Sequence, residues 1–208
     1  MSTARKIAEE LLRIEAVSLR PDEPFTWTSG IKSPIYCDNR LTMSYPEVRR
    51  LICRSFASIV REQFPETEVI AGTATAGIPH AAWLAEELNL PMIYIRSKPK
   101  GHGKGNQIEG RLAEGAKTIV IEDLISTGGS SIEAAKAIQD AGGQVVSVLA
   151  IFSYQFPRAE QAFEQAGLIF QTLSHYTALL ETAGEAGIIK SEQIDALAAW
   201  RKYPEEYR

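Results

Sequence analysis

The chain has 208 residues, 45% of them apolar and 23% charged, which are ordinary values for a globular protein with a real core. Its net charge of −4 gives no long-range attraction to nucleic acid, so an anionic substrate needs local cationic groups. Cys37 and Cys53 do not make a disulfide framework, and residues 1–15 lack the apolar core of a signal peptide. The longest near-apolar run, Val145–Phe152, is too short to cross a membrane, so we expect a cytoplasmic protein.

The first 65 residues combine two helical patterns with a stretch rich in turn signals. A helix is predicted over 4–16, where apolar residues recur on one face. Short strands and loops are predicted over 21–40, between prolines and glycine. A second helix is predicted from Tyr45 to about Gln63, with Pro46 at an early position that suits proline.

From residue 69 onward, short apolar runs alternate with helical patterns. The predicted strands are 69–72, 92–95, 118–121, 145–152 and 168–173, and the predicted helices are 77–88, 130–141, 157–166, 176–184 and 191–202. This alternation predicts one α/β domain over 1–208, with a central, mainly parallel sheet flanked by helices. Ligands bind such sheets at the carboxyl ends of the strands, so the loops after the strands should gather at one edge.

The segment 118–130 carries the clearest chemical signal. A β-branched run is followed by Glu122, Asp123 and a run of hydroxyl residues and glycines that leads into a helix. Adjacent carboxylates at a strand end need partners, and glycines with helix-start N–H groups favour a phosphate. A sugar phosphate, with a phosphate at one end and a diol at the other, matches this polarity. A capped turn with carboxylates in water is the alternative, which the acid pair disfavours.

Residues 98–110 form a second unusual segment, with three lysines, His102 and four glycines. A mobile cationic loop suits closure over a reacting anion, with water excluded. A solvated surface loop with scattered lysines is the alternative. The phosphate signal at 118–130 makes the functional interpretation the better one.

Residues 118–130 resemble the signature of the type I phosphoribosyltransferases, which bind 5-phosphoribosyl-1-diphosphate. The resemblance implies their fold, with a small N-terminal hood formed by residues about 20–40. It also implies that Glu122 and Asp123 hold the ribose hydroxyls and act in catalysis. The rest of the substrate-binding segment, including the cradle of the 5-phosphate, is Leu124, Ile125, Ser126, Thr127, Gly128, Gly129 and Ser130.

Three other segments resemble the orotate phosphoribosyltransferase family in particular. Residues 94–110 resemble its catalytic loop, whose Arg, Lys and His correspond to Arg96, Lys100 and His102. Residues 26–40 resemble its substrate hood, and 72–79 its diphosphate-binding loop. The resemblance implies transfer of ribose-5-phosphate to orotate, giving orotidine 5′-monophosphate and diphosphate in pyrimidine biosynthesis.

The resemblance implies that Arg96, Lys100 and His102 contact the diphosphate and that Lys100 and His102 act in catalysis. The resemblance further implies a homodimer in which the 98–110 loop reaches the neighbouring active site. Mg2+ would be bound mainly through the diphosphate and water, so no direct protein metal site is assigned. No nucleic-acid or membrane partner is expected.

Three positions depart from the enteric-type members of the family. Thr28 and Ala76 stand where those enzymes have lysines, and Tyr154 stands where they have an orotate-binding arginine. Ser126 and backbone donors in 28–38 are the candidate replacements. A phosphoribosyltransferase for another base and a non-enzymatic sensor of the diphosphate donor remain alternatives. The hood and the 98–110 loop favour orotate, and a sensor would need a DNA-binding module for which the sequence before the hood leaves no room.

Other polar and aromatic residues are predicted to be structural. His80 lies at a helix start beside Pro79, and His175 lies at a strand end with no motif around it. The three tryptophans are expected in packing. Residues 201–208 are expected to form a solvated tail.

Overall fold

The structure, a computed structural model, describes residues 2–26, 30, 32–97, 107–202 and 204. Its helices are α1 (Thr3–Arg13), the 3-10 helix η1 (Asn39–Ser44), α2 (Pro46–Gln63), α3 (Gly77–Leu88), α4 (Gly129–Asp140), α5 (Pro157–Gln165), α6 (Tyr176–Glu185) and α7 (Ser191–Trp200). Its strands are β1 (Val17–Leu19), β2 (Phe25–Thr26), β3 (Lys32–Ser33), β4 (Ile35–Cys37), β5 (Val69–Thr73), β6 (Met92–Ile95), β7 (Ile108–Glu109), β8 (Lys117–Ile125), β9 (Gln144–Ser153) and β10 (Phe170–His175).

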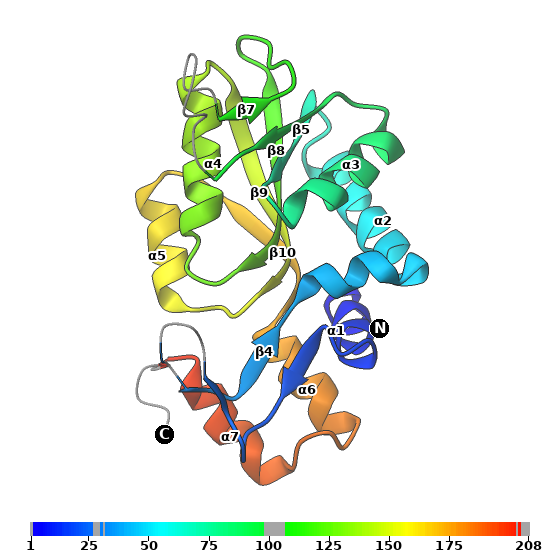
Figure 1. The fold of residues 1–208 in the computed structure, drawn as a ribbon, viewed down its shortest axis with the longest axis vertical. Coiled ribbons are helices and arrows are strands. Elements are labelled where there is room, and N and C mark those ends of the chain that lie inside the picture. Colours follow the sequence, from blue (N-terminus) through cyan, green and yellow to red (C-terminus); the bar gives the residue numbers. More distant parts are fainter. Residues whose placement is uncertain (1, 27–29, 31, 98–106, 203, 205–208) are drawn as a thin grey trace.

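Six of these strands form the central sheet, in the order β10-β9-β8-β5-β6-β7 (Figure 1). The first five run parallel, and β7 alone is antiparallel, paired with β6. The predicted α/β fold with a mainly parallel sheet is therefore confirmed. The prediction of an uninterrupted loop over 98–110 is wrong at its end, because Ile108 and Glu109 form the edge strand β7.

The sheet is covered on both faces, as Figure 1 shows, with α4 and α5 on one side and α2 and α3 on the other. Successive residues of β8 point to opposite faces, so the strand contributes to two hydrophobic clusters. Ile119 and Ile121 pack in the cluster that contains Phe56 of α2. Val120 packs in the cluster that contains Ile138 of α4 and Phe163 of α5. Burial on both faces explains why these strands are apolar runs without polar alternation.

The remaining elements lie at one end of the sheet (Figure 1), and Leu11 of α1 and Leu179 of α6 belong to the same hydrophobic cluster as Ile119 of β8. Within the expected hood, β2 pairs with β3, and β4 pairs with β1, both antiparallel. Helices α1, α6 and α7 pack near them, and Trp200 of α7 is buried against Tyr154, Phe156 and Tyr176. The predicted packing role of Trp200 is confirmed.

The start of the C-terminal segment differs from the predicted solvated tail. Arg201 is partly buried and donates through Nη1 to Gln155 Oε1 and to Thr177 Oγ1, both at 2.9 Å. Pro204 is also buried. Sequence periodicity does not reveal such contacts, because they join residues far apart in the chain. Helix α1 is likewise shorter than predicted: it ends at Arg13, and Glu15 takes a positive φ of 58°.

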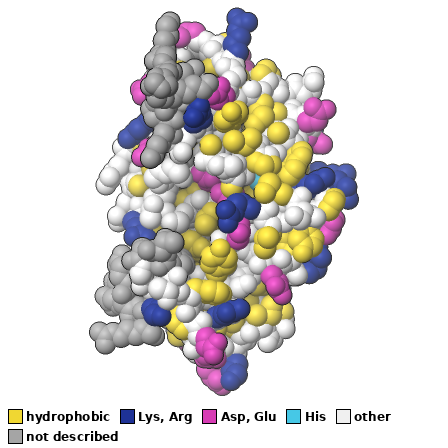
Figure 2. Space-filling view, in the orientation of Figure 1, with side chains coloured by type: hydrophobic (Ala, Val, Ile, Leu, Met, Phe, Trp, Pro, Cys, Tyr) yellow, Lys and Arg dark blue, Asp and Glu magenta, His cyan; other side chains and the backbone are white. Residues whose placement is uncertain are grey.

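On the face drawn in Figure 2, cationic and anionic side chains are interspersed, and hydrophobic side chains gather beside α3. Among the residues that the structure describes, no helix combines the length and the apolar character needed to span a membrane.

Candidate active site

The candidate site lies at the carboxyl edge of the parallel strands, where β5, β6, β8 and β9 end. Close packing at this edge depends on Gly77, the first residue of α3. A Cβ on Gly77 would lie 2.3 Å from the carbonyl oxygen of Ile121 and 2.5 Å from Thr73 Oγ1. Only glycine lets α3 begin this close to β8, so the predicted diphosphate-binding loop lies beside the acid pair.

The acid pair lies within β8, whereas the sequence placed it in a loop after Ile121. The strand continues to Ile125, and Leu124 and Ile125 pair in register with Phe152 and Ser153 of β9. Ile125 is 0% exposed, backbone included, so this predicted substrate-binding residue has no open surface in the structure. The position of the acids at the strand end was predicted correctly, but the strand itself was predicted too short.

Glu122 is 6% exposed and is held by three protein donors. Its Oε2 accepts from Ser130 Oγ at 3.2 Å and from Ser131 Oγ at 3.1 Å, and its Oε1 accepts from the backbone N–H of Asp123 at 3.0 Å. These donors offset the cost of burying a carboxylate. They also tie the first turn of α4 to the end of β8. Ser131 was not predicted, because it follows the glycine run and looks like an ordinary helical residue.

Asp123 is partly buried, and burial raises the pKa of its carboxyl from 3.8 to about 7, with the neighbouring charge of Glu122 as the second cause. Its backbone carbonyl accepts from Asn39 Nδ2 at 2.7 Å. Asn39 belongs to η1, 84 positions earlier in the chain, and no sequence signal indicated this contact. The two adjacent acids thus differ: Glu122 is bound into the protein, and Asp123 can exchange a proton near neutral pH.

The turn after β8 has the features of an anion site. Gly128 takes a φ of +83°, and a Cβ there would lie 2.7 Å from Phe163 Cε2, so glycine is required. It precedes α4, whose first turn carries neither an acidic residue nor a side-chain cap among the described residues. Thr127, Gly129 and Ser130 are exposed. Uncapped N–H groups at a helix start favour a phosphate.

Arg96 follows β6 and lines a cleft with Thr73 and Ala74 of the predicted diphosphate-binding segment and Ser130 of α4. The structure therefore brings two predicted site residues, Arg96 and Ser130, to one cleft. The guanidinium of Arg96 pairs with Glu109 of β7, with Nη1 and Oε1 3.4 Å apart. Glu109 was not predicted, because β7 is too short to show a strand pattern.

Other residues that the sequence analysis singled out lie outside this cleft or outside the described part of the chain. Lys100, His102 and Thr28 lie outside the described residues. Ala76 occupies the N-cap position of α3 without a side-chain cap hydrogen bond. Tyr154 is 4% exposed in an aromatic cluster with Phe152 and Phe156. The ring of Tyr154 thus occupies core space at the position where the enteric-type enzymes have an arginine.

The two described histidines have structural contacts. His80 is 2% exposed, and its Nε2 lies 3.2 Å from Thr42 Oγ1, while burial lowers its pKa to about 4. His175 caps α6, where its Nδ1 accepts from the backbone N–H of Ala178 at 3.2 Å. Their predicted structural roles are confirmed.

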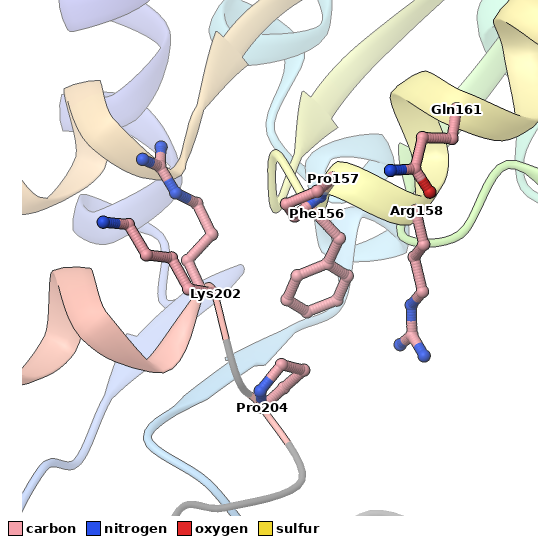
Figure 3. Close-up of a pocket in the computed structure, with 7 residues that line it drawn as sticks. Phe156, Pro157, Arg158, Gln161, Lys202 and Pro204 are labelled. Atoms are coloured by element: carbon pink, nitrogen blue, oxygen red, sulfur yellow. The ribbon is translucent and has the colours of Figure 1, made fainter.

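A separate pocket of about 240 Å³ lies between the start of α5 and the end of α7 (Figure 3). Its lining residues are Phe156, Pro157, Arg158, Gln161, Arg201, Lys202 and Pro204. The guanidinium of Arg158 lies over the ring of Phe156, with Cζ 5.0 Å from the ring centroid. In Figure 3 the charged end of Lys202 points away from that ring. Among the described residues that line the pocket, these two cations therefore do not converge on one ligand position.

Comparison with known proteins places this site in a family. Residues 45–166 match the phosphoribosyl transferase domain. The orotate phosphoribosyltransferase of Enterococcus faecalis is 58% identical over 204 residues, covering 98% of this chain and 97% of that protein. The Bacillus subtilis enzyme of the same name is 60% identical over 199 residues, covering 96% of this chain and 92% of that protein.

A solved structure has the same fold. The orotate phosphoribosyltransferase of Aeropyrum pernix is 26% identical, with a TM-score of 0.76, and the match covers 86% of this chain and 98% of that one. The chain therefore belongs to the phosphoribosyltransferase family, and the relatives that it matches over nearly their full length are orotate phosphoribosyltransferases.

Proposed function

We propose that the chain transfers ribose-5-phosphate from 5-phosphoribosyl-1-diphosphate to N1 of orotate, giving orotidine 5′-monophosphate and diphosphate in pyrimidine biosynthesis. The observation that carries this conclusion is the near-full-length identity of 58% to an enzyme of that name. The site geometry supports it, because the acid pair at the end of β8 and the uncapped start of α4 flank a single turn.

The ribose-phosphate end of the donor would bind this segment. Asp123 accepts from the ribose hydroxyls, and Glu122 does so by sharing its carboxylate with Ser130 and Ser131. The 5-phosphate binds the N–H groups from Ser126 to Ser130 and the hydroxyls of Ser126 and Thr127, because the hydroxyl of Ser130 donates to Glu122. As the bond to the leaving group breaks, positive charge builds on the ribose ring, and nearby carboxylates stabilise that charge.

The diphosphate end would be held by cationic groups. Arg96 offers a planar fork of donors for the leaving group after release from Glu109. Lys100 stabilises the charge that develops on the departing diphosphate, and His102 donates a hydrogen bond or a proton to it. Both belong to the 98–110 loop, which we propose reaches the active site of the second subunit of a homodimer.

Magnesium is the proposed cofactor. In the described part of the chain, no group of three or more His, Cys, Asp or Glu side chains could hold a metal ion, and Glu122 is engaged by two serines. These residues fit an ion that is bound mainly by the diphosphate, the ribose hydroxyls and water, with Asp123 in contact through water. When bound, the ion would neutralise diphosphate charge.

Orotate recognition would depend on the hood, residues about 20–40, within the proposed single domain. Orotate is already anionic, so its N1 needs no strong general base, and positioning is the main task of the protein. Ser126, which is partly buried, and backbone donors in 28–38 are the proposed contacts in place of the residues missing at Thr28, Ala76 and Tyr154. We place the reaction in the cytoplasm, which suits the free thiols of Cys37 and Cys53.

A direct assay tests the function. Orotate consumption is followed by absorbance with the diphosphate donor and Mg2+, and hypoxanthine, uracil and adenine are tried as competing acceptors. Turnover is expected with orotate alone. Turnover of another base without turnover of orotate would contradict the acceptor while leaving the phosphoribosyl transfer, and no turnover of any base would contradict the reaction.

A further inference from the structure

Strand β8 extends beyond its neighbour β5 at the site. It pairs with β5 only as far as Ile121, which lies opposite Gly72, but pairs with β9 as far as Ile125. Two side chains continue the pairing along the edge that β5 leaves open. Thr73 Oγ1 donates to the carbonyl of Ile121 at 3.1 Å, and Asn39 Nδ2 donates to the carbonyl of Asp123 at 2.7 Å. Asn39 therefore holds the backbone of Asp123 where the sheet no longer does.

Asn39 is itself linked to α3 through Thr42. Thr42 Oγ1 donates to the carbonyl of Asn39 at 2.6 Å and lies 3.2 Å from His80 Nε2. Because the threonine gives its only proton to Asn39, its oxygen must accept from His80, so Nε2 carries the ring proton. His80 lies in the first turn of α3, directly after the diphosphate-binding segment. Three hydrogen bonds thus connect that helix to Asp123.

The hydrogen-bond network of Asn39, Thr42 and His80 is buried. Asn39, Thr42 and His80 are 1%, 0% and 2% exposed, so water does not compete for these bonds. Burial keeps His80 neutral near pH 7. Asn39 Oδ1 and His80 Nδ1 have no hydrogen-bond partner in the described structure. A buried acceptor without a partner costs stability, and such costs are typical of positions whose geometry serves function.

We propose that Thr42 is a positioning residue for the reaction. By joining Asn39 to His80, it fixes Asp123 where the carboxylate meets the ribose hydroxyls and sets that position relative to the diphosphate-binding segment. The inference rests on the proposed ribose-binding role of Asp123.

The chain offers a matched control. Thr67 Oγ1 donates to the carbonyl of Phe64 at 2.7 Å, which is the same bond to the third preceding residue that Thr42 makes to Asn39. Thr67 is also buried, but it precedes β5 at the amino edge of the sheet, away from the site. Thr42→Val and Thr67→Val therefore both remove a hydroxyl bond to the third preceding carbonyl, at opposite edges of the sheet, and Thr42→Val also removes the bond with His80.

Both variants are expected to have a lower melting temperature, and Thr42→Val should lose more because it also leaves the buried Nε2–H of His80 without a partner. Thr42→Val should lower kcat/KM for the diphosphate donor about ten-fold with the orotate KM unchanged, because a small misplacement of a substrate-binding group is costly. Thr67→Val should keep the wild-type kcat/KM, and Thr42→Ser, which retains the hydroxyl, should recover most of the loss. Equal kcat/KM for the two valine variants would overturn the inference.

A double variant separates this inference from the proposed function. If Thr42 acts through Asp123, Thr42→Val should lower donor affinity little further in an Asp123→Ala background. Additive losses would overturn the positioning role. An Asp123→Ala enzyme with wild-type kcat/KM would overturn the ribose-binding assignment and the inference together. A strong loss of kcat/KM in Asp123→Ala, with no loss of kcat/KM in Thr42→Val, would overturn this inference and leave the proposed function standing.

Discussion

Glu122 and Arg96 lie at the same edge of the sheet, but the fold holds them in different ways. Glu122 is 6% exposed and accepts from three protein donors. The side chain of Arg96 is 39% exposed and has one ion pair, to Glu109 at 3.4 Å. Several enclosed bonds fix a group before substrate arrives, whereas an exposed ion pair contributes little and exchanges readily. Under the proposed assignment, the group that would bind ribose phosphate is preformed, and the group that would bind the diphosphate is completed on binding.

The largest predicted effect concerns the diphosphate end. Lys100→Ala should lower kcat about 10²–10³-fold, by analogy with the removal of one donor that stabilises a developing anion. Steady-state kinetics with saturating donor and orotate measures it. Lys104→Ala, in the same loop, serves as the control and should keep most of its activity. A Lys100→Ala enzyme with wild-type kcat would show that the 98–110 loop does not act on the leaving group.

A smaller effect is predicted at Glu122, in the part of the site proposed to bind ribose phosphate. Glu122→Gln keeps the shape of the side chain but loses the charge and at least one of three accepted hydrogen bonds. We expect kcat/KM for the donor to fall about ten-fold, with a lower melting temperature, because charge-assisted bonds are the stronger ones. Asp140→Asn, at the exposed far end of α4, is the control. Loss of stability without loss of kcat/KM would limit Glu122 to a structural role.

The smallest effect is a pH dependence of stability without substrate. The pKa of Asp123 is raised from 3.8 to about 7, so the fold favours the neutral carboxyl. Its contribution to stability is complete below pH 3.8 and is lost as the pH rises through about 7. Asp123→Asn cannot ionise, so wild type should lose stability relative to this variant between about pH 4 and pH 7.

Denaturant unfolding of both proteins across this range measures the difference. Because the pKa of His80 is lowered to about 4, the fold also loses stability as the pH falls below 6.5. This loss is the same in both proteins, so it cancels in the comparison. A constant difference between wild type and Asp123→Asn, or one that changes in the opposite sense, would contradict the raised pKa.

The sequence was informative where the signal was local. Apolar runs and helical periodicity predicted the parallel sheet, and the acid pair followed by glycines predicted the segment at the end of β8. The end of β8 was predicted too short because Glu122 and Asp123 look like loop residues. The strand continues because Leu124 pairs with Phe152 of β9, a contact that depends on the register of distant segments.

Residues that act through long-range contacts could not be predicted. Asn39 reaches Asp123 across 84 positions, and Thr42 reaches His80 across 38. Each looks like an ordinary turn or helix-start residue in the sequence. Ser131 lies one position beyond the predicted cradle, and only the register of α4 turns its hydroxyl toward Glu122.

Binding of ribose 5-phosphate tests the two-ended site most directly, because this ligand carries the phosphate and the diol but no diphosphate. Calorimetric titration into wild type, Asp123→Ala and Lys100→Ala would measure it. The account predicts that Asp123→Ala loses most of the affinity and that Lys100→Ala binds like wild type. Retained affinity in Asp123→Ala together with lost affinity in Lys100→Ala would contradict the assignment of the two ends.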